Sequence, residues 1–81
     1  MLLDYFEDVK KIIAQQFALE EEDIEEDSLL EEDLNISELD LEDVIAILEK
    51  KYGIEIHQSV YSKFLKVGDI STFLYENADQ V

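Results

Sequence analysis

Apolar residues recur every three to four positions in three stretches of this chain, with charged residues between them. The first stretch, residues 3 to 17, has the pattern of an amphipathic helix. The second, residues 38 to 52, is followed by Gly53, the residue type that most readily takes the left-handed conformation ending a helix. A further helix is predicted near residues 68 to 77, and residues 59 to 64 leave room for a short one. The positions expected to face the core are Tyr5, Phe6, Val9, Ile12, Ile13 and Phe17, then Leu41, Val44, Ile45, Leu48 and Tyr52, then Val67, Ile70, Phe73 and Leu74.

Between the first two helices lies an acidic stretch, residues 18 to 37, in which apolar residues stand singly or in pairs. Their spacing suits no long helix, so we expect a long loop held to the core by Ile24, Leu29, Leu30 and Leu34. Ordered loops of this length are uncommon in compact domains and often functional. The sequence therefore predicts an all-α fold, a single domain over residues 1–81 with three longer helices and one short one.

The net negative charge of the chain restricts the classes of molecule that it can bind. Asp and Glu number 22 against 6 Lys and Arg, a net charge of -16, while 47% of the residues are hydrophobic and suffice for a core. Such a surface repels nucleic-acid phosphates and anionic membranes and attracts basic protein surfaces. The N-terminal sequence "MLLDYFEDVKK" has acids where a signal peptide is basic, and no apolar run approaches a membrane span. We expect a cytoplasmic monomer that binds no nucleic acid and no membrane.

Residues for catalysis or metal binding are not assembled in an obvious pattern. His57 is the only histidine and there is no cysteine, so an imidazole-activated nucleophile would rest on a scattered serine, and we expect no catalytic site. The stretch "DIEEDSLLEEDL", from Asp23, departs from a calcium loop because Ser28 replaces the glycine and Leu34 the last glutamate. We therefore predict no specific metal site, only non-specific binding of divalent ions.

The stretch "DLNISELDLEDV" places Ser37 at the head of the second predicted helix, with Asp40 three residues later. Serine is a favoured residue before a helix, and an acid three positions on completes a capping box. On local grounds Ser37 is a helix cap.

Five pieces in order, "VKKIIAQQF", "LEEDL", the helix opening Leu-Asp-x-x-acid, "ILEKKYGIEI" and "KVGDI", resemble the acyl carrier protein family. The family pattern runs along the chain from Val9 to Leu74 without a gap. The resemblance implies a four-helix bundle whose second helix begins Asp-Ser-Leu. It also implies that this serine carries 4'-phosphopantetheine, whose thiol holds an acyl chain in fatty-acid, polyketide or related thioester biosynthesis.

In the ungapped register Glu38 falls on the family's serine and Ser37 on the preceding aspartate. Two functions stay open. The chain is a non-standard or unmodified homolog that acts by protein–protein interaction, or it is a working carrier with 4'-phosphopantetheine displaced by one residue, onto Ser37. Attachment at Ser37 would make Glu38 an extra residue at the helix start. Because each residue turns the helix face by about 100°, the extra residue would turn Leu41, Val44 and Leu48 away from the core. A third class, an acidic module that mimics a polyanion, follows from charge alone.

The family's enzymes bind the second helix through basic surface patches, which the resemblance transfers to this chain. Leu39 lies off the core-facing positions, so we expect it to supply an apolar contact within an acidic rim. Lys50 and Lys51 stand where the family is usually acidic. The predicted partner-binding residues are Glu38, Leu39, Asp40, Asp43 and Glu49.

Overall fold

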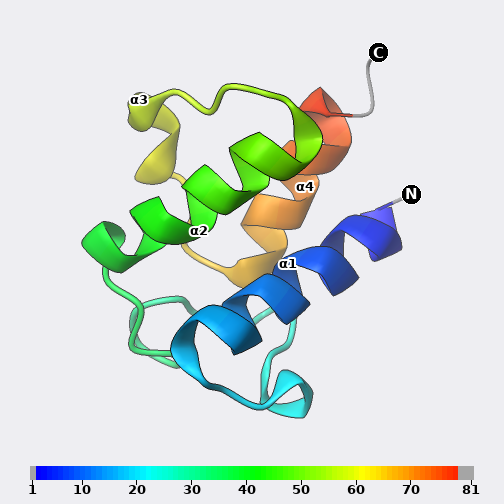
Figure 1. The fold of residues 1–81 in the computed structure, drawn as a ribbon. Helices are drawn as coiled ribbons and strands as arrows, with labels where there is room; N and C mark the ends of the chain where they lie inside the picture. Colours follow the sequence, from blue (N-terminus) through cyan, green and yellow to red (C-terminus); the bar gives the residue numbers. More distant parts are fainter. Residues whose placement is uncertain (1, 79–81) are drawn as a thin grey trace.

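The structure is a computed structural model that describes residues 2–78. Its elements are α1 (Leu2–Phe17), the 3-10 turn η1 (Glu21–Asp23), α2 (Glu38–Tyr52), α3 (Gln58–Tyr61) and α4 (Val67–Asn77). Figure 1 shows α1, α2 and α4 as the body of the bundle and the short α3 at the upper left, above the first half of α2 in that view. Within the described residues there is no strand, only an isolated antiparallel bridge between Leu29 and Lys66. The predicted all-α bundle of three longer helices and one short one is confirmed.

The helix bounds agree closely with the pattern of apolar residues. α2 has the predicted bounds, and Gly53 after it has φ 64° and ψ 38°, the left-handed conformation expected of it. α3 ends at Tyr61, earlier than predicted, and Phe64 beyond it is buried in the core. η1 was not predicted.

The core lies where α1 packs against α2 and α4. The most deeply buried apolar side chains come from these three helices: Val9, Ile13, Val44, Ile45, Leu48, Val67, Ile70 and Leu74. Phe73, predicted to be buried, is half-buried and packs edge-on against Phe64 with ring centroids 5.6 Å apart. Tyr5, Ile12, Phe17 and Tyr52 are also half-buried at the margin of the core. Two-thirds of the predicted core positions are thus buried, and the remaining third are half-buried.

The loop between α1 and α2 is anchored as predicted, with an additional anchor. Ile24 and Leu30 are buried and Leu29 and Leu34 are half-buried, but Ile36, which the pattern did not identify, is buried too. We infer that Ile36 sets the position of the chain one residue before Ser37, where α2 is about to begin.

Backbone hydrogen bonds tie this loop to the segment that enters α4. The Leu30 N–H donates to the Leu65 carbonyl (2.9 Å), and the Val67 N–H donates to the Ser28 carbonyl (3.0 Å). The loop is therefore ordered by its own backbone as well as by its apolar anchors.

A polar contact joins α1 to the end of α2. The Tyr52 hydroxyl donates to the Asp8 carboxylate, and Lys51 Nζ lies 3.3 Å from the same carboxylate. The hydrogen bond from Tyr52 holds the pKa of Asp8 below its ordinary value of 3.8, Lys51 adds to this, and partial burial opposes it. Burial and the Asp8 carboxylate raise the pKa of Tyr52. This contact stabilises the fold fully above the unfolded pKa of Asp8 and loses its effect as the pH falls through the lower folded-state pKa.

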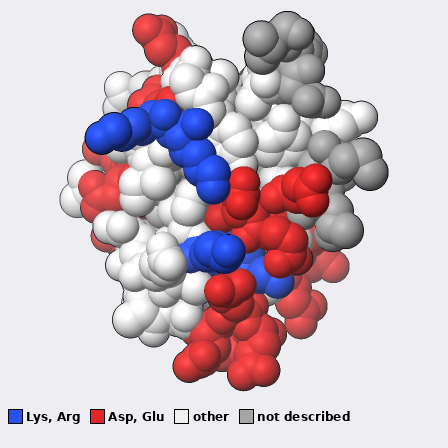
Figure 2. All heavy atoms as spheres, turned by 45° about the vertical axis from the view of Figure 1, so that its right-hand side comes forward, with Lys and Arg blue, Asp and Glu red and all other residues white. Residues whose placement is uncertain are grey.

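Acidic side chains gather on the surface. Figure 2 shows them over much of the lower part of one face, with few lysines among them. None of the helices among residues 2–78 is long and apolar enough to cross a membrane.

Candidate functional site

The start of α2 is a capping box. Ser37 has an extended backbone, its Oγ accepts a hydrogen bond from the Asp40 N–H (3.1 Å), and Asp40 Oδ2 accepts one from the Ser37 N–H (3.2 Å). Two backbone donors that a helix start leaves without partners are thereby satisfied. The prediction that Ser37 caps this helix is confirmed.

The five predicted partner-binding residues differ in exposure. Glu38, Leu39 and Asp43 are exposed, and Leu39 retains 73% of its accessible surface. Asp40 is half-buried and holds the cap. Glu49 is half-buried as well, because its Oε2 accepts a hydrogen bond from the Ile56 N–H (2.8 Å) in the turn after α2. The first three are free to meet a partner, and the role of all five stays a prediction.

A cavity of about 120 Å³ opens beside the start of α2. Its apolar lining comes from the loop, α2 and the segment that runs from the end of α3 toward α4. The polar residues that line it are Glu31, Ser37, Glu38 and Ser62. Sequence reasoning missed this cavity because its walls are assembled from segments far apart in the chain. The lining apolar and aromatic residues are Leu30, Ile36, Leu41, Tyr61, Phe64 and Leu65.

His57, the only histidine, caps α3. Its Nδ1 accepts a hydrogen bond from the Ser59 N–H (3.2 Å) and lies 3.0 Å from Ser59 Oγ. The described residues, 2–78, bring together no group of three or more acidic or histidine side chains placed to hold a metal ion. Non-specific divalent binding stays a prediction.

No protein-family model matches this chain. It is 39% identical over 70 residues to the acyl carrier protein of Chlamydia muridarum (strain MoPn / Nigg), covering 86% of this chain and 91% of that protein. It is 32% identical over 72 residues to the acyl carrier protein of Wolinella succinogenes, covering 89% and 95%. This chain belongs to the acyl carrier protein family. A third relative, the acyl carrier protein of Campylobacter lari (strain RM2100 / D67 / ATCC BAA-1060), is 32% identical over 69 residues, covering 85% and 90%.

Membership of the acyl carrier protein family raises the question whether the residues at the start of α2 fit 4'-phosphopantetheine. The group is joined to a serine hydroxyl, and Glu38, in the register of that serine, offers a carboxylate instead. Ser37 has a hydroxyl one residue earlier, but its oxygen is the acceptor of the capping bond. In the ungapped register of the family pattern, Glu38 therefore offers no hydroxyl to which the group could be joined.

Replacing Ser37 with alanine tests the cap. We expect Ser37→Ala to lower the free energy of unfolding by about 1 kcal/mol, because the Asp40 N–H loses its acceptor. In a domain of this size that corresponds to a fall of roughly 4–8 °C in melting temperature, measurable by circular dichroism.

Two control variants accompany this measurement. Ser37→Asn keeps a side-chain oxygen that can cap the helix and should stay close to the native stability. Ser62→Ala removes an exposed serine hydroxyl outside any helix start and should change little. Equal losses in Ser37→Ala and Ser62→Ala would contradict a special role for the Ser37 cap.

Proposed function

We propose that this chain is a non-standard acyl carrier protein that acts without 4'-phosphopantetheine. In this role enzymes of fatty-acid, polyketide or related thioester biosynthesis recognise the folded protein, and it acts by protein–protein interaction. One observation carries the proposal: Ser37 is engaged as the helix cap while Glu38 holds the register of the attachment serine.

The chemistry of Glu38 and Ser37 supports the proposal that the chain acts without 4'-phosphopantetheine. A carboxylate cannot replace a serine hydroxyl as the acceptor of a phosphopantetheinyl group. Esterifying Ser37 would instead turn the hydroxyl oxygen that caps α2 into an ester oxygen, a poorer hydrogen-bond acceptor with a bulky substituent. Modification of Ser37 would therefore weaken the bond that starts the helix.

Recognition by enzymes with basic surface patches is supported by the exposed side chains of α2. Glu38 and Asp43 flank Leu39, which supplies an apolar side chain within an acidic surface. The net charge of -16 would attract a basic enzyme surface over a distance and speed encounter, most strongly at low ionic strength.

A second function is a working carrier with 4'-phosphopantetheine on Ser37. It is favoured by the exposure of Ser37 at the lining of the cavity, whose apolar walls suit an alkyl group, and by the names of the relatives.

The test is incubation with a promiscuous phosphopantetheinyl transferase and coenzyme A, followed by intact-mass measurement. The native chain is expected to gain no mass. Glu38→Ser, which restores a serine in the attachment register, is expected to gain one phosphopantetheinyl group. Ser37→Ala and Ser37→Asn are the controls, and Ser37→Asn retains the cap.

Two results would separate the alternatives. Addition to the native chain that disappears in both Ser37 variants would overturn the proposal and establish the displaced carrier. Addition to Glu38→Ser alone would show that the fold is still recognised by the transferase and that the residue in the attachment register prevents modification.

A further inference from the structure

The outer face of α2 presents a line of side chains directly opposite the core. Leu39, Asp43, Ala46 and Lys50 follow one another at spacings of four, three and four residues, so they lie on one helical face. All four are exposed. We call these residues the α2 stripe. At about 1.5 Å per residue its ends lie roughly 16 Å apart, enough to meet several side chains of one partner.

The charge of the stripe changes sign along the helix. Its first half carries Asp43 and is flanked by the exposed Glu38 and Glu42, whereas its far end is Lys50. Among residues 2–78, Lys50 makes no salt bridge. The stripe is thus acidic at one end and basic at the other.

The neighbouring lysine has a different role. Lys51 is paired with Asp8 of α1 at 3.3 Å, so it joins the two helices. A lysine in the last turn also interacts favourably with the helix dipole, and Lys51 already supplies one. Lys50 takes no part in the contact with α1, and the dipole, which favours both lysines of the last turn, does not require one on the outer face.

Apolar side chains accompany this change of sign. Leu39 lies on the stripe with 73% of its surface exposed, and Ile47 lies at its edge with 37% exposed. Two large apolar side chains on the outside of one helix are better placed for contact with another protein than for stability of this one.

We propose that the α2 stripe docks a protein surface with two charges: basic residues opposite Asp43 and its acidic flanks, an apolar pocket for Leu39, and an acidic residue opposite Lys50. This inference rests on the proposed function, since it specifies the partner of the same surface. A uniformly basic patch would place like charge against Lys50 at one end, so Lys50 selects against it.

The test uses two synthetic helical peptides as probes, each as long as α2 and with the same apolar centre. The bipartite peptide has lysines in its first half and glutamates in its last turn, and the uniform peptide has lysines at both ends. Dissociation constants and binding positions are measured by chemical-shift titration of the isotope-labelled chain. The quantity compared is the ratio of the two dissociation constants, which cancels much of the general attraction of an acidic protein for basic peptides.

Lys50→Glu is expected to shift this ratio toward the uniform peptide by about fivefold, the size of a change from one favourable to one unfavourable exposed charge pair. The shifted resonances should belong to α2. Leu39→Ala should weaken the binding of both peptides without changing the ratio of their dissociation constants.

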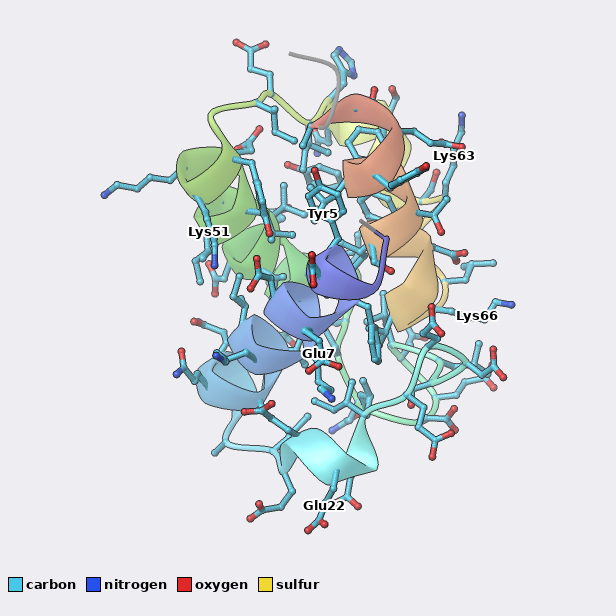
Figure 3. The ribbon with its side chains drawn as sticks, turned by 90° about the vertical axis from the view of Figure 1, so that its right-hand side faces the viewer. Tyr5, Glu7, Glu22, Lys51, Lys63 and Lys66 are labelled. Atoms are coloured by element: carbon cyan, nitrogen blue, oxygen red, sulfur yellow. The ribbon has the colours of Figure 1, made fainter. Side chains whose placement is uncertain are left out.

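Lys63→Glu is the matched control, with the same change of charge away from the stripe. Figure 3 shows Lys63 on the far side of the molecule from Lys51, whose helix carries the stripe. In Lys63→Glu the ratio of the two dissociation constants should change by less than about twofold, because the altered charge is distant from the bound peptide and screened.

Equal shifts for Lys50→Glu and Lys63→Glu, or resonance changes away from α2, would overturn the inference. The proposed function fails by a different measurement, addition of mass to the native chain in the transferase assay. The charge preference at Lys50 is read on that chain whether or not it is modified, so the two failures are distinguishable.

Discussion

Leu48→Ala is expected to lower the free energy of unfolding by about 2–5 kcal/mol, the range for removing a large aliphatic side chain from a packed core. Leu48 is fully buried on the inner face of α2. A domain of 81 residues has a stability of about 4–12 kcal/mol, at roughly 0.05–0.15 kcal/mol per residue. This one substitution therefore removes a large share of the stability and loosens the helix that carries the α2 stripe. Urea unfolding followed by circular dichroism measures it.

Ile47→Ala is the matched control for this prediction. It also shortens a large aliphatic side chain on the same helix, at the adjacent position, but Ile47 is exposed. The expected loss is smaller, below about 2 kcal/mol, because Ile47 is already 37% exposed and its removal leaves no enclosed cavity. A loss as large for Ile47→Ala as for Leu48→Ala would contradict the assignment of the inner and outer faces of α2.

The bounds of α2 could be predicted because its determinants are local. Burial imposes the period of Leu41, Val44 and Leu48, and the residues that begin and end the helix are adjacent to it: Ser37 with its capping box, and Gly53 in the left-handed conformation. The family resemblance and the helical period lead to the same fold.

The features that the sequence did not reveal have two physical origins. η1 consists of three exposed acids held by backbone bonds, including that from the Ile24 N–H to the Glu21 carbonyl, so no apolar period marks it. The contact between Tyr52 and Asp8 joins residues 44 positions apart, and spacing along the chain cannot indicate such a pair.

At the candidate site, too, the features set by neighbouring residues were predictable and those set by contacts between distant segments were not. The Ser37 cap was predictable from four consecutive residues, and the exposure of Leu39 from its place off the core period. The hydrogen bond from the Ile56 N–H that occupies Glu49 depends on the path of the chain after Gly53. The cavity depends on three segments meeting.

Added salt is expected to raise the melting temperature by on the order of 10 °C between about 0.01 M and 1 M sodium chloride. Sixteen uncompensated negative charges lie on a body whose extents are 32 × 24 × 19 Å. At about 20 Å two charges repel by roughly 0.2 kcal/mol even in bulk water. Summed over the many pairs, this repulsion opposes compaction more than it opposes the expanded unfolded chain.

The salt range follows from the screening length. It is about 30 Å at 0.01 M, close to the size of the molecule, and about 3 Å at 1 M, so that only adjacent charges still interact. Differential scanning calorimetry at several concentrations measures the effect. A flat response would contradict charge repulsion as the main electrostatic cost of folding.

A comparison of magnesium with sodium distinguishes charge screening from the binding of divalent ions. At equal ionic strength magnesium chloride should raise the melting temperature more than sodium chloride if divalent ions bind the acidic loop between residues 20 and 33. The variant with Glu20, Glu21 and Glu22 each replaced by glutamine should respond less to both salts, because three charges are gone from the region that includes η1. If magnesium and sodium act equally at matched ionic strength in both proteins, salt stabilises the fold by screening alone and the prediction of divalent binding is wrong.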